Sequence, residues 1–404
     1  MTREEVLAYP FQSKIPLDPP DEWTRVRERC PVVTVTLPSG DEASLVTRYD
    51  EARELLGDAR FSRQLPSDTG ARIAATEDGG VFTRQAGTGL KMFEGAGHLR
   101  WRRLMSKAFT VRRIENMRPG IQKVADGLVD AMIADGPPAD IVSALGYQLP
   151  VRVIGDLLGV PESDHHQFRH WSDAILTLTR YSKEDVDAAR VEFGTYLAQL
   201  IEAKRAAPGD DLLSELLQVT DNEDGRLDLV ELVITAMALL VAGHETTANM
   251  IGKMMAMLLA DRRQFEMLVE HPDIIPSAVD EVLRFDTNPS LGVPRFISED
   301  IELGGEQVAK DSTLIVSPAI ANRDPRKFPE PERMDLRRQN NQHLSFGAGP
   351  HFCLGAPLAR AELQVVLGTL ASRLPGLRLA TEPDDLKIKR GLIVVGLEEL
   401  QVAW

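Results

Sequence analysis

The sequence is short of positive charge, of cysteine and of uninterrupted apolar runs. Its 46 Lys and Arg residues face 61 Asp and Glu, a net charge of −15 that repels phosphate backbones. No apolar stretch follows the start MTREEVLAYP, as a secretory signal would require. The most apolar helical run, residues 232–243, is interrupted by His244 and Glu245 before the roughly 20 residues that span a bilayer. These absences predict a cytoplasmic protein without a nucleic-acid or membrane partner.

The two cysteines, Cys30 and Cys353, are too few for a disulfide framework, so each needs its own explanation. Cys30 lies between a predicted helix and strand, where packing is a sufficient reason for it.

Helical periodicity dominates the chain, and β patterns are few and short. Alternation around a turn predicts a hairpin from residues 32–35 and 44–47. Residues 65–97 lack periodicity, which is typical of a loop over a buried site. A very long helix is expected from about residue 228 to 260. Further helices are predicted at residues 100–109, 114–134, 145–158, 164–178, 185–204, 276–284 and 356–373, and strands at 301–303, 314–316 and 392–395. The expected class is a single, mainly α domain over residues 1–404 with a minor β part.

The segment FGAGPHFCLG, residues 346–355, places Cys353 in a loop with three glycines and a proline. These residues favour tight turns, which would bring backbone N–H groups toward the sulfur. Those groups and the N-terminus of the next helix are expected to lower the pKa of the thiol, and a thiolate is a strong ligand for haem iron. Two other interpretations are a buried apolar cysteine and a zinc site with His343 and His351, although no CxxC pair lies nearby.

This segment matches Phe-x-x-Gly-x-x-x-Cys-x-Gly at every fixed position, and the chain thereby resembles the soluble bacterial cytochromes P450. The resemblance runs from the hairpin to Trp404. It implies roughly a dozen helices and small sheets around a buried b-type haem (iron protoporphyrin IX), whose iron is bound by Cys353.

A second motif, AGHETTA at residues 242–248, lies inside the long predicted helix. Glycine and threonine are poor helix formers, but the Thr246 hydroxyl can bond the Ala242 carbonyl, and Gly243 removes bulk, so a groove is expected there. A simple helix kink is the other interpretation. The resemblance implies that Glu245 and Thr246 are the acid–alcohol pair that delivers protons during oxygen activation.

Glu281 and Arg284 stand three apart on one predicted helix, where a surface ion pair is the simplest reading. The resemblance implies instead a scaffold in which this pair joins a later arginine, and Arg323 is the expected third member.

Four dispersed residues suit the two propionates of a haem, because buried carboxylates need Arg or His partners. The resemblance assigns this role to His98, Arg102, Arg295 and His351, each of which alone could be an ordinary surface residue.

Apolar positions near these motifs suggest a hydrophobic or amphipathic small-molecule substrate. The expected contacts are Leu239, Ala242, Leu291, Val293 and Ile393, with ordinary core packing as the alternative for each.

A basic island at residues 100–118 carries seven Arg or Lys residues against one Glu. It is either a solvated helix face or a docking patch for an acidic electron carrier. The resemblance favours a ferredoxin, supplied with electrons from NAD(P)H by a ferredoxin reductase.

The expected function is a monomeric monooxygenase that inserts one oxygen atom of O2 into a C–H bond or alkene, similar to actinobacterial enzymes that tailor natural products. Oxidative C–C or aromatic coupling without oxygen insertion is one alternative. A non-catalytic haem sensor or carrier is another, although it would not need Glu245 and Thr246.

Overall fold

The structure, a computed structural model, describes residues 6–14, 16–58, 60–62, 70–73, 92, 94–218, 227–287, 291–297 and 299–404. The helices are α1 Asp21–Arg29, α2 Tyr49–Gly57, α3 Gly95–Ser106, α4 Val111–Asp135, α5 Gln148–Leu158, α6 His165–Ile175, α7 Lys183–Ala206, α8 Leu212–Gln218, α9 Leu229–Ala260, α10 Arg262–Glu270, α11 Ile275–Phe285, α12 Pro318–Ala321 and α13 Ala356–Arg373. The strands are β1 Leu7–Ala8, β2 Val32–Thr36, β3 Glu42–Val46, β4 Phe61–Ser62, β5 Ala139–Asp140, β6 Val293–Ile297, β7 Ile301–Leu303, β8 Glu306–Val308, β9 Thr313–Val316, β10 Arg378–Leu379 and β11 Gln401–Ala403. The predicted class, mainly α with a minor β part, is confirmed.

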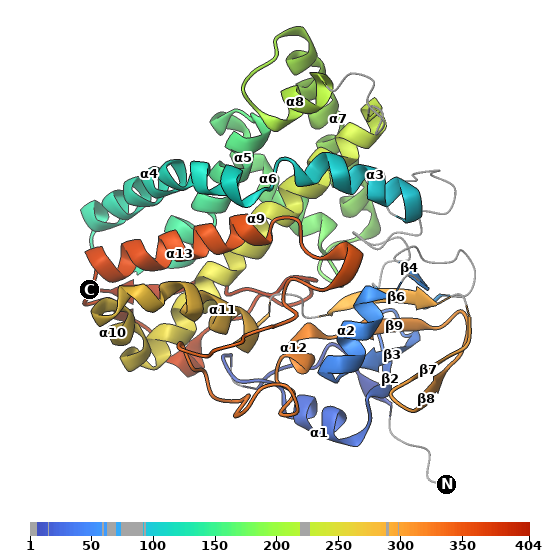
Figure 1. Ribbon diagram of the computed structural model, residues 1–404. Helices are drawn as coiled ribbons and strands as arrows, with labels where there is room; N and C mark the ends of the chain where they lie inside the picture. Colours follow the sequence, from blue (N-terminus) through green and yellow to red (C-terminus); the bar gives the residue numbers. More distant parts are fainter. Residues whose placement is uncertain are drawn as a thin grey trace.

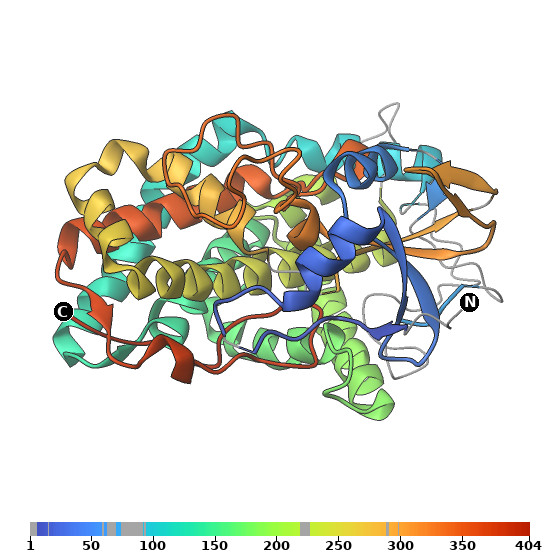
Figure 2. The same cartoon turned by 90° about the horizontal axis from the view of Figure 1, so that it is seen from below.

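Helix α9 is the central helix of the helical part. It begins with a capping box, in which Asp228 and Glu231 each accept a hydrogen bond from the other's backbone N–H, and it continues for 32 residues. It crosses the middle of the molecule and packs on α5, α7, α10 and α13 (Figures 1 and 2). Among the described helices, α9 alone is long and apolar enough to cross a membrane, which the sequence did not suggest. Its central position explains this composition, because a helix that is apolar on all sides belongs in a core.

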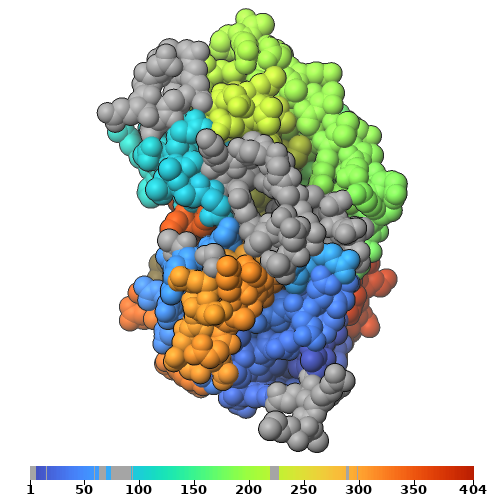
Figure 3. Space-filling model, turned by 90° about the vertical axis from the view of Figure 1, so that its right-hand side faces the viewer, coloured from blue at the N-terminus to red at the C-terminus, as the bar shows by residue number. Residues whose placement is uncertain are grey.

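The main sheet lies at one side of the helical part and has the strand order β1-β2-β3-β9-β6-β4. The predicted hairpin is present, with β2 and β3 antiparallel. On the face shown in Figure 3, the orange and blue atoms of the sheet part lie in one half, and green, yellow-green and cyan atoms of the helical part lie in the other. Strand β6 pairs with β9 so that Arg295 lies opposite Leu314, in the interior of the sheet.

The long helix and the helix after the cysteine loop are confirmed within one or two residues. The predicted helix at 145–158 is divided into a π-helical turn, Val142–Gly146, and α5. The predicted strand at 392–395 is wrong. Its segment instead bonds the turn after α6, where Leu178 N donates to Gly391 O (2.8 Å) and Ile393 N to Leu176 O (2.9 Å), so its backbone groups are already used. Most of the loop predicted at 65–97 lies outside the described residues.

Candidate active site

The cysteine loop folds back on itself immediately before α13. Cys353 N donates to Phe346 O at 2.8 Å, which closes the loop. Gly349 has φ +68°, and a Cβ atom there would lie 2.5 Å from the carbonyl oxygen of Leu56. Only glycine fits this approach of the loop to α2. The motif's glycine at 349 therefore has a packing reason.

The sulfur of Cys353 lies at the start of α13, where the backbone N–H groups of Gly355 and Ala356 favour its thiolate form. Burial nevertheless raises the pKa of the Cys353 thiol, and it outweighs those N–H groups and the charges of Arg102 and Arg360, which lower it. The predicted lowering of the pKa is therefore wrong for the protein alone, because desolvation exceeds the N–H contribution. A bound metal would supply the remaining drive to deprotonate the thiol.

Three of the four predicted propionate partners lie together around Cys353. The rings of His98, on α3, and His351 have centroids 4.1 Å apart. Arg102, one helical turn beyond His98, donates from Nη2 to Phe352 O at 2.6 Å, and its charge acts on Cys353. Arg295 lies on β6, nearly fully buried, and its guanidinium donates to the Pro294 carbonyl at 2.9 Å.

The middle of α9 carries an accessible stripe. Ala238, Ala242 and Thr246, each four residues from the next, are exposed or half-buried. Thr246 Oγ1 donates to Ala242 O at 2.6 Å, as the motif predicts. Gly243, however, does not widen this stripe. A Cβ atom there would lie 2.9 Å from Ile154 Cγ1, so the missing side chain admits α5 and the predicted reason for this glycine is wrong.

Glu245 lies on the buried side of α9, beside His244 and Asn249. Asn249 Nδ2 donates to Glu245 Oε2 at 3.2 Å, and His244 Nε2 lies 3.5 Å from Oε1. His244 Nδ1 donates to Leu240 O at 2.7 Å, so Nδ1 carries a proton. Burial alone would raise the pKa of Glu245, but the neighbouring His244, with Lys389 and Arg169, lowers it below its usual value. The carboxylate is therefore ionised at neutral pH. The sequence interpretation missed Asn249, although it stands four residues after Glu245.

Known proteins resemble the chain over almost its full length. The family model "Cytochrome P450" matches residues 151–375. The chain belongs to the cytochrome P450 family. It is 40% identical to nocardicin C N-oxygenase of Nocardia uniformis subsp. tsuyamanensis and 41% identical to mycinamicin IV hydroxylase/epoxidase of Micromonospora griseorubida, each match covering 100% of both chains. A solved structure of the putative thioether synthase SgvP, involved in the tailoring step of griseoviridin, superposes with a TM-score of 0.92 at 38% identity, covering 99% of this chain and 100% of that one. This cytochrome P450 is a haem-dependent monooxygenase.

The donor set around Cys353 fits the haem that the family binds. A haem needs a ligand for its iron and cationic or N–H partners for two carboxylates. The cluster offers a sulfur whose thiolate is favoured by two backbone N–H groups, with two imidazoles and a guanidinium in the same region. The zinc alternative has no support, since no group of three or more His, Cys, Asp or Glu side chains could hold a metal among the residues that the structure covers.

The scaffold of this cytochrome P450 differs from the predicted trio at one position. Arg284 donates to both Glu281 oxygens at 2.8 Å, and both side chains are fully buried. The second arginine on Glu281 is Arg338, whose Nε lies 3.1 Å from each carboxylate oxygen. Asn341 adds a hydrogen bond at 3.0 Å.

Arg323 is not the third member. It is buried beside α11, donates to the Phe285 carbonyl at 2.7 Å and forms an ion pair with Glu332. The Phe285 carbonyl, at the end of α11, thus accepts the hydrogen bonds of the Arg323 guanidinium, which the sequence had assigned to Glu281. Nothing in the spacing distinguishes Arg338 from its neighbours Arg333 and Arg337.

The predicted substrate contacts differ in how exposed their side chains are. Leu239, Leu291 and Ile393 are buried, whereas Ala242 is exposed and Val293 is partly exposed. Ala238, which the sequence interpretation missed, shares the accessible stripe of α9 with Ala242.

Proposed function

We propose that this cytochrome P450 oxidises a hydrophobic or amphipathic natural product by hydroxylation or epoxidation. The observation that carries the proposal is the acid–alcohol pair, an accessible Thr246 beside an ionised Glu245 on the helix that crosses the core. A sensor or carrier would need neither group. The names of the relatives, which act on nocardicin C and mycinamicin IV, support a substrate of secondary metabolism.

Within this proposal Cys353 holds the haem iron, and His98, Arg102, Arg295 and His351 bind the propionates. The bound haem supplies the centre at which O2 is activated. Arg102 already lies against the cysteine loop through the Phe352 carbonyl, so it can bridge the loop and one propionate. The two backbone N–H groups at the sulfur stabilise its negative charge once the iron is bound.

Glu245 and Thr246 have different roles in the proton transfer. Glu245 receives a proton on its carboxylate from the buried side, where Asn249 holds the carboxylate by a hydrogen bond and His244 lies beside it. Thr246 presents its hydroxyl on the accessible side and keeps its orientation through the bond to Ala242 O. Proton transfer by such a positioned pair typically contributes about 10²–10⁴-fold. Ala242 and Val293, with Leu239, Leu291 and Ile393 behind them, give the substrate side its apolar character.

Oxygen insertion is tested by product analysis under ¹⁸O2 in a reconstituted reaction. Candidate macrolides and β-lactams are first ranked by the spin-state change of the haem absorption as they bind. Insertion predicts one labelled oxygen in the product. A product without the label would instead support oxidative coupling.

The electrons come, in this proposal, from NAD(P)H through a ferredoxin reductase and a ferredoxin that docks on the basic island. Some basic residues of this island are already in ion pairs within the protein, and others are not. The paired ones are Arg100, Arg113 and Arg118, whose partners are Glu231, Glu215 and Glu115. Lys107 and Arg112 are exposed and have no ion pair with any described residue. They are therefore the charges most available to an acidic carrier.

This docking surface is tested by the rate of haem reduction by ferredoxin. The double variant Lys107→Glu, Arg112→Glu should slow reduction about tenfold or more at low salt, and the difference should shrink as salt rises. Lys123→Glu, an exposed position farther along α4, is the control. Equal rates in the double variant and the control would overturn this surface.

A further inference from the structure

Arg360, on α13, is a cation near Cys353 that the proposed function does not use. Its guanidinium carbon lies 4.6 Å from the centre of the Phe346 ring. Phe346 belongs to the cysteine loop, and its carbonyl accepts the hydrogen bond from Cys353 N, at 2.8 Å, that closes the loop. The charge of Arg360 acts on Cys353 together with that of Arg102. Arg360 therefore contacts the loop through an aromatic ring and favours negative charge on the sulfur.

Asp280, on α11, is the anion that holds this arginine. Arg360 Nε donates to Asp280 Oδ1 at 2.7 Å, and His343 Nε2 lies 3.4 Å from the same oxygen. His343 Nδ1 accepts from the backbone N–H of Ser345 at 3.3 Å, so Nε2 carries the proton and donates to Asp280. Burial raises the pKa of Asp280, but the hydrogen bonds of His343 and Arg360 lower it below its usual value, so the carboxylate is ionised at neutral pH. The ion pair thus has its positive end on Phe346 and its negative end on α11.

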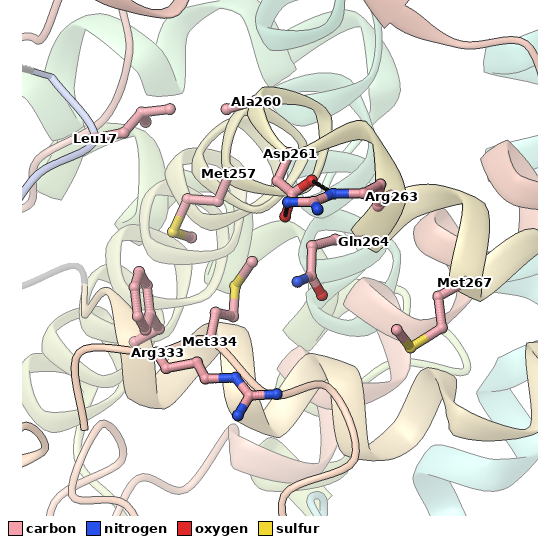
Figure 4. Close-up of a pocket in the computed structure, with 10 residues that line it drawn as sticks. Leu17, Met257, Ala260, Asp261, Arg263, Gln264, Met267, Arg333 and Met334 are labelled. Carbon is pink, nitrogen blue, oxygen red and sulfur yellow. Dashed lines mark hydrogen bonds and ion pairs between the residues drawn. The ribbon is translucent and has the colours of Figure 1, made fainter. Parts of the chain in front are cut away.

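The surroundings of this pair differ from those of an ordinary surface ion pair. At the end of α9, beside a methionine-lined groove of ≈ 700 Å³, Arg263 Nε lies 2.8 Å from Asp261 Oδ1 (Figure 4). The Arg263 side chain is 85% exposed, so water screens its charge. The Arg360 side chain is 31% exposed and lies against an aromatic ring, where a charge is screened less.

We propose that Arg360 is a positioning residue that sets the reduction potential of the haem bound to Cys353. A cation near the sulfur lowers the electron density that the thiolate donates and favours the added electron, so it raises the potential. Asp280 limits the effect, because its carboxylate opposes the guanidinium charge from 2.7 Å away. The reduction adds one electron from the iron–sulfur carrier and changes no bond or proton of these side chains. This inference deepens the proposed function and rests on Cys353 as the iron ligand.

The test measures the midpoint potential of the haem-loaded protein by titration with dithionite, followed by absorption. Arg360→Met should lower the equilibrium constant for one-electron reduction about threefold or more, because a charge that is partly exposed keeps only part of its Coulomb energy. Asp280→Asn should raise the same constant, because it leaves the guanidinium without an opposing charge. Arg360→Lys should keep a potential near that of the wild type, because it keeps the charge.

Arg373→Met is the matched control. Arg373 lies on the same helix, has the same exposed fraction of 31%, and also pairs with an aspartate, Asp130 of α4. It lies about 20 Å farther along α13, by the helical rise per residue. The control variant removes the same charge and should leave the potential unchanged.

The sign of the shifts decides the outcome, because a change in loop packing alone would not give Arg360→Met and Asp280→Asn opposite shifts. The proposal is overturned if both variants shift the potential in the same direction, or if neither shifts it more than Arg373→Met does. Where Arg360→Met does not hold haem, a lower potential in Asp280→Asn overturns it. The red-shifted carbon monoxide band tests Cys353 separately, so an intact band with unchanged potentials overturns the role of Arg360 and not the proposed function.

Discussion

Replacing Arg338 by methionine tests the ion-pair network behind the cysteine loop. The Arg338 side chain is 9% exposed, and its Nε lies 3.1 Å from each oxygen of the fully buried Glu281. It also donates to the Pro329 carbonyl at 2.8 Å. Breaking a buried ion pair typically costs about 3–5 kcal/mol. Because Glu281 retains Arg284 and Asn341, we expect the lower end, about 3 kcal/mol of unfolding free energy.

The assay is urea unfolding followed by far-UV circular dichroism, with haem retention followed in parallel. Arg337→Met is the control, because Arg337 is exposed and adjacent, and it should change stability by no more than about 0.5 kcal/mol. Haem loss should accelerate in Arg338→Met alone. Equal losses of stability in the two variants would refute the assignment of Arg338 as the second arginine on Glu281.

Three further variants test other parts of the structure. Thr246→Val should lower the product formed per NAD(P)H consumed about tenfold or more, while Thr247→Val on the other face should retain the wild-type ratio. Gly349→Ala should cost about 1–3 kcal/mol in urea unfolding and lower the haem content, because its φ of +68° and the nearby Leu56 carbonyl both exclude a side chain. Burial raises the pKa of Glu362, which is 1% exposed, well above its usual value, so the folded state holds a proton that the unfolded state releases, and wild-type stability falls as pH rises between the two pKa values. Urea unfolding from pH 5 to pH 8 should therefore show the unfolding free energy of Glu362→Gln rising relative to that of the wild type as pH rises. A difference in unfolding free energy that stays constant with pH would contradict a protonated, buried Glu362.

The sequence predicted what depends on local pattern. Helix α9 followed from a long helical pattern that begins near Asp228, and the hairpin followed from alternation around a turn. The contact of Thr246 with Ala242 is also local, since it spans one helical turn. Such features need no knowledge of distant residues.

The wrong predictions about Arg323, the pKa of Cys353 and Gly243 all depend on packing between residues far apart in the sequence. Whether Arg323 or Arg338 reaches Glu281 depends on how the chain after α12 folds back on α11. The pKa of Cys353 depends on burial by elements far along the chain, and this outweighs the local N–H groups that the sequence suggested. Gly243 looked like part of a ligand groove, but it faces Ile154 of α5. None of these contacts leaves a periodic or spacing signal.

The central claim is that Cys353 binds the haem iron as a thiolate, and the carbon monoxide complex of the reduced protein tests it most directly. The wild type should show the red-shifted absorption band of a thiolate ligand. Cys30→Ser should retain the band, and Cys353→Ser should lose it, even where haem remains bound. A red-shifted band that persists in Cys353→Ser would contradict the account.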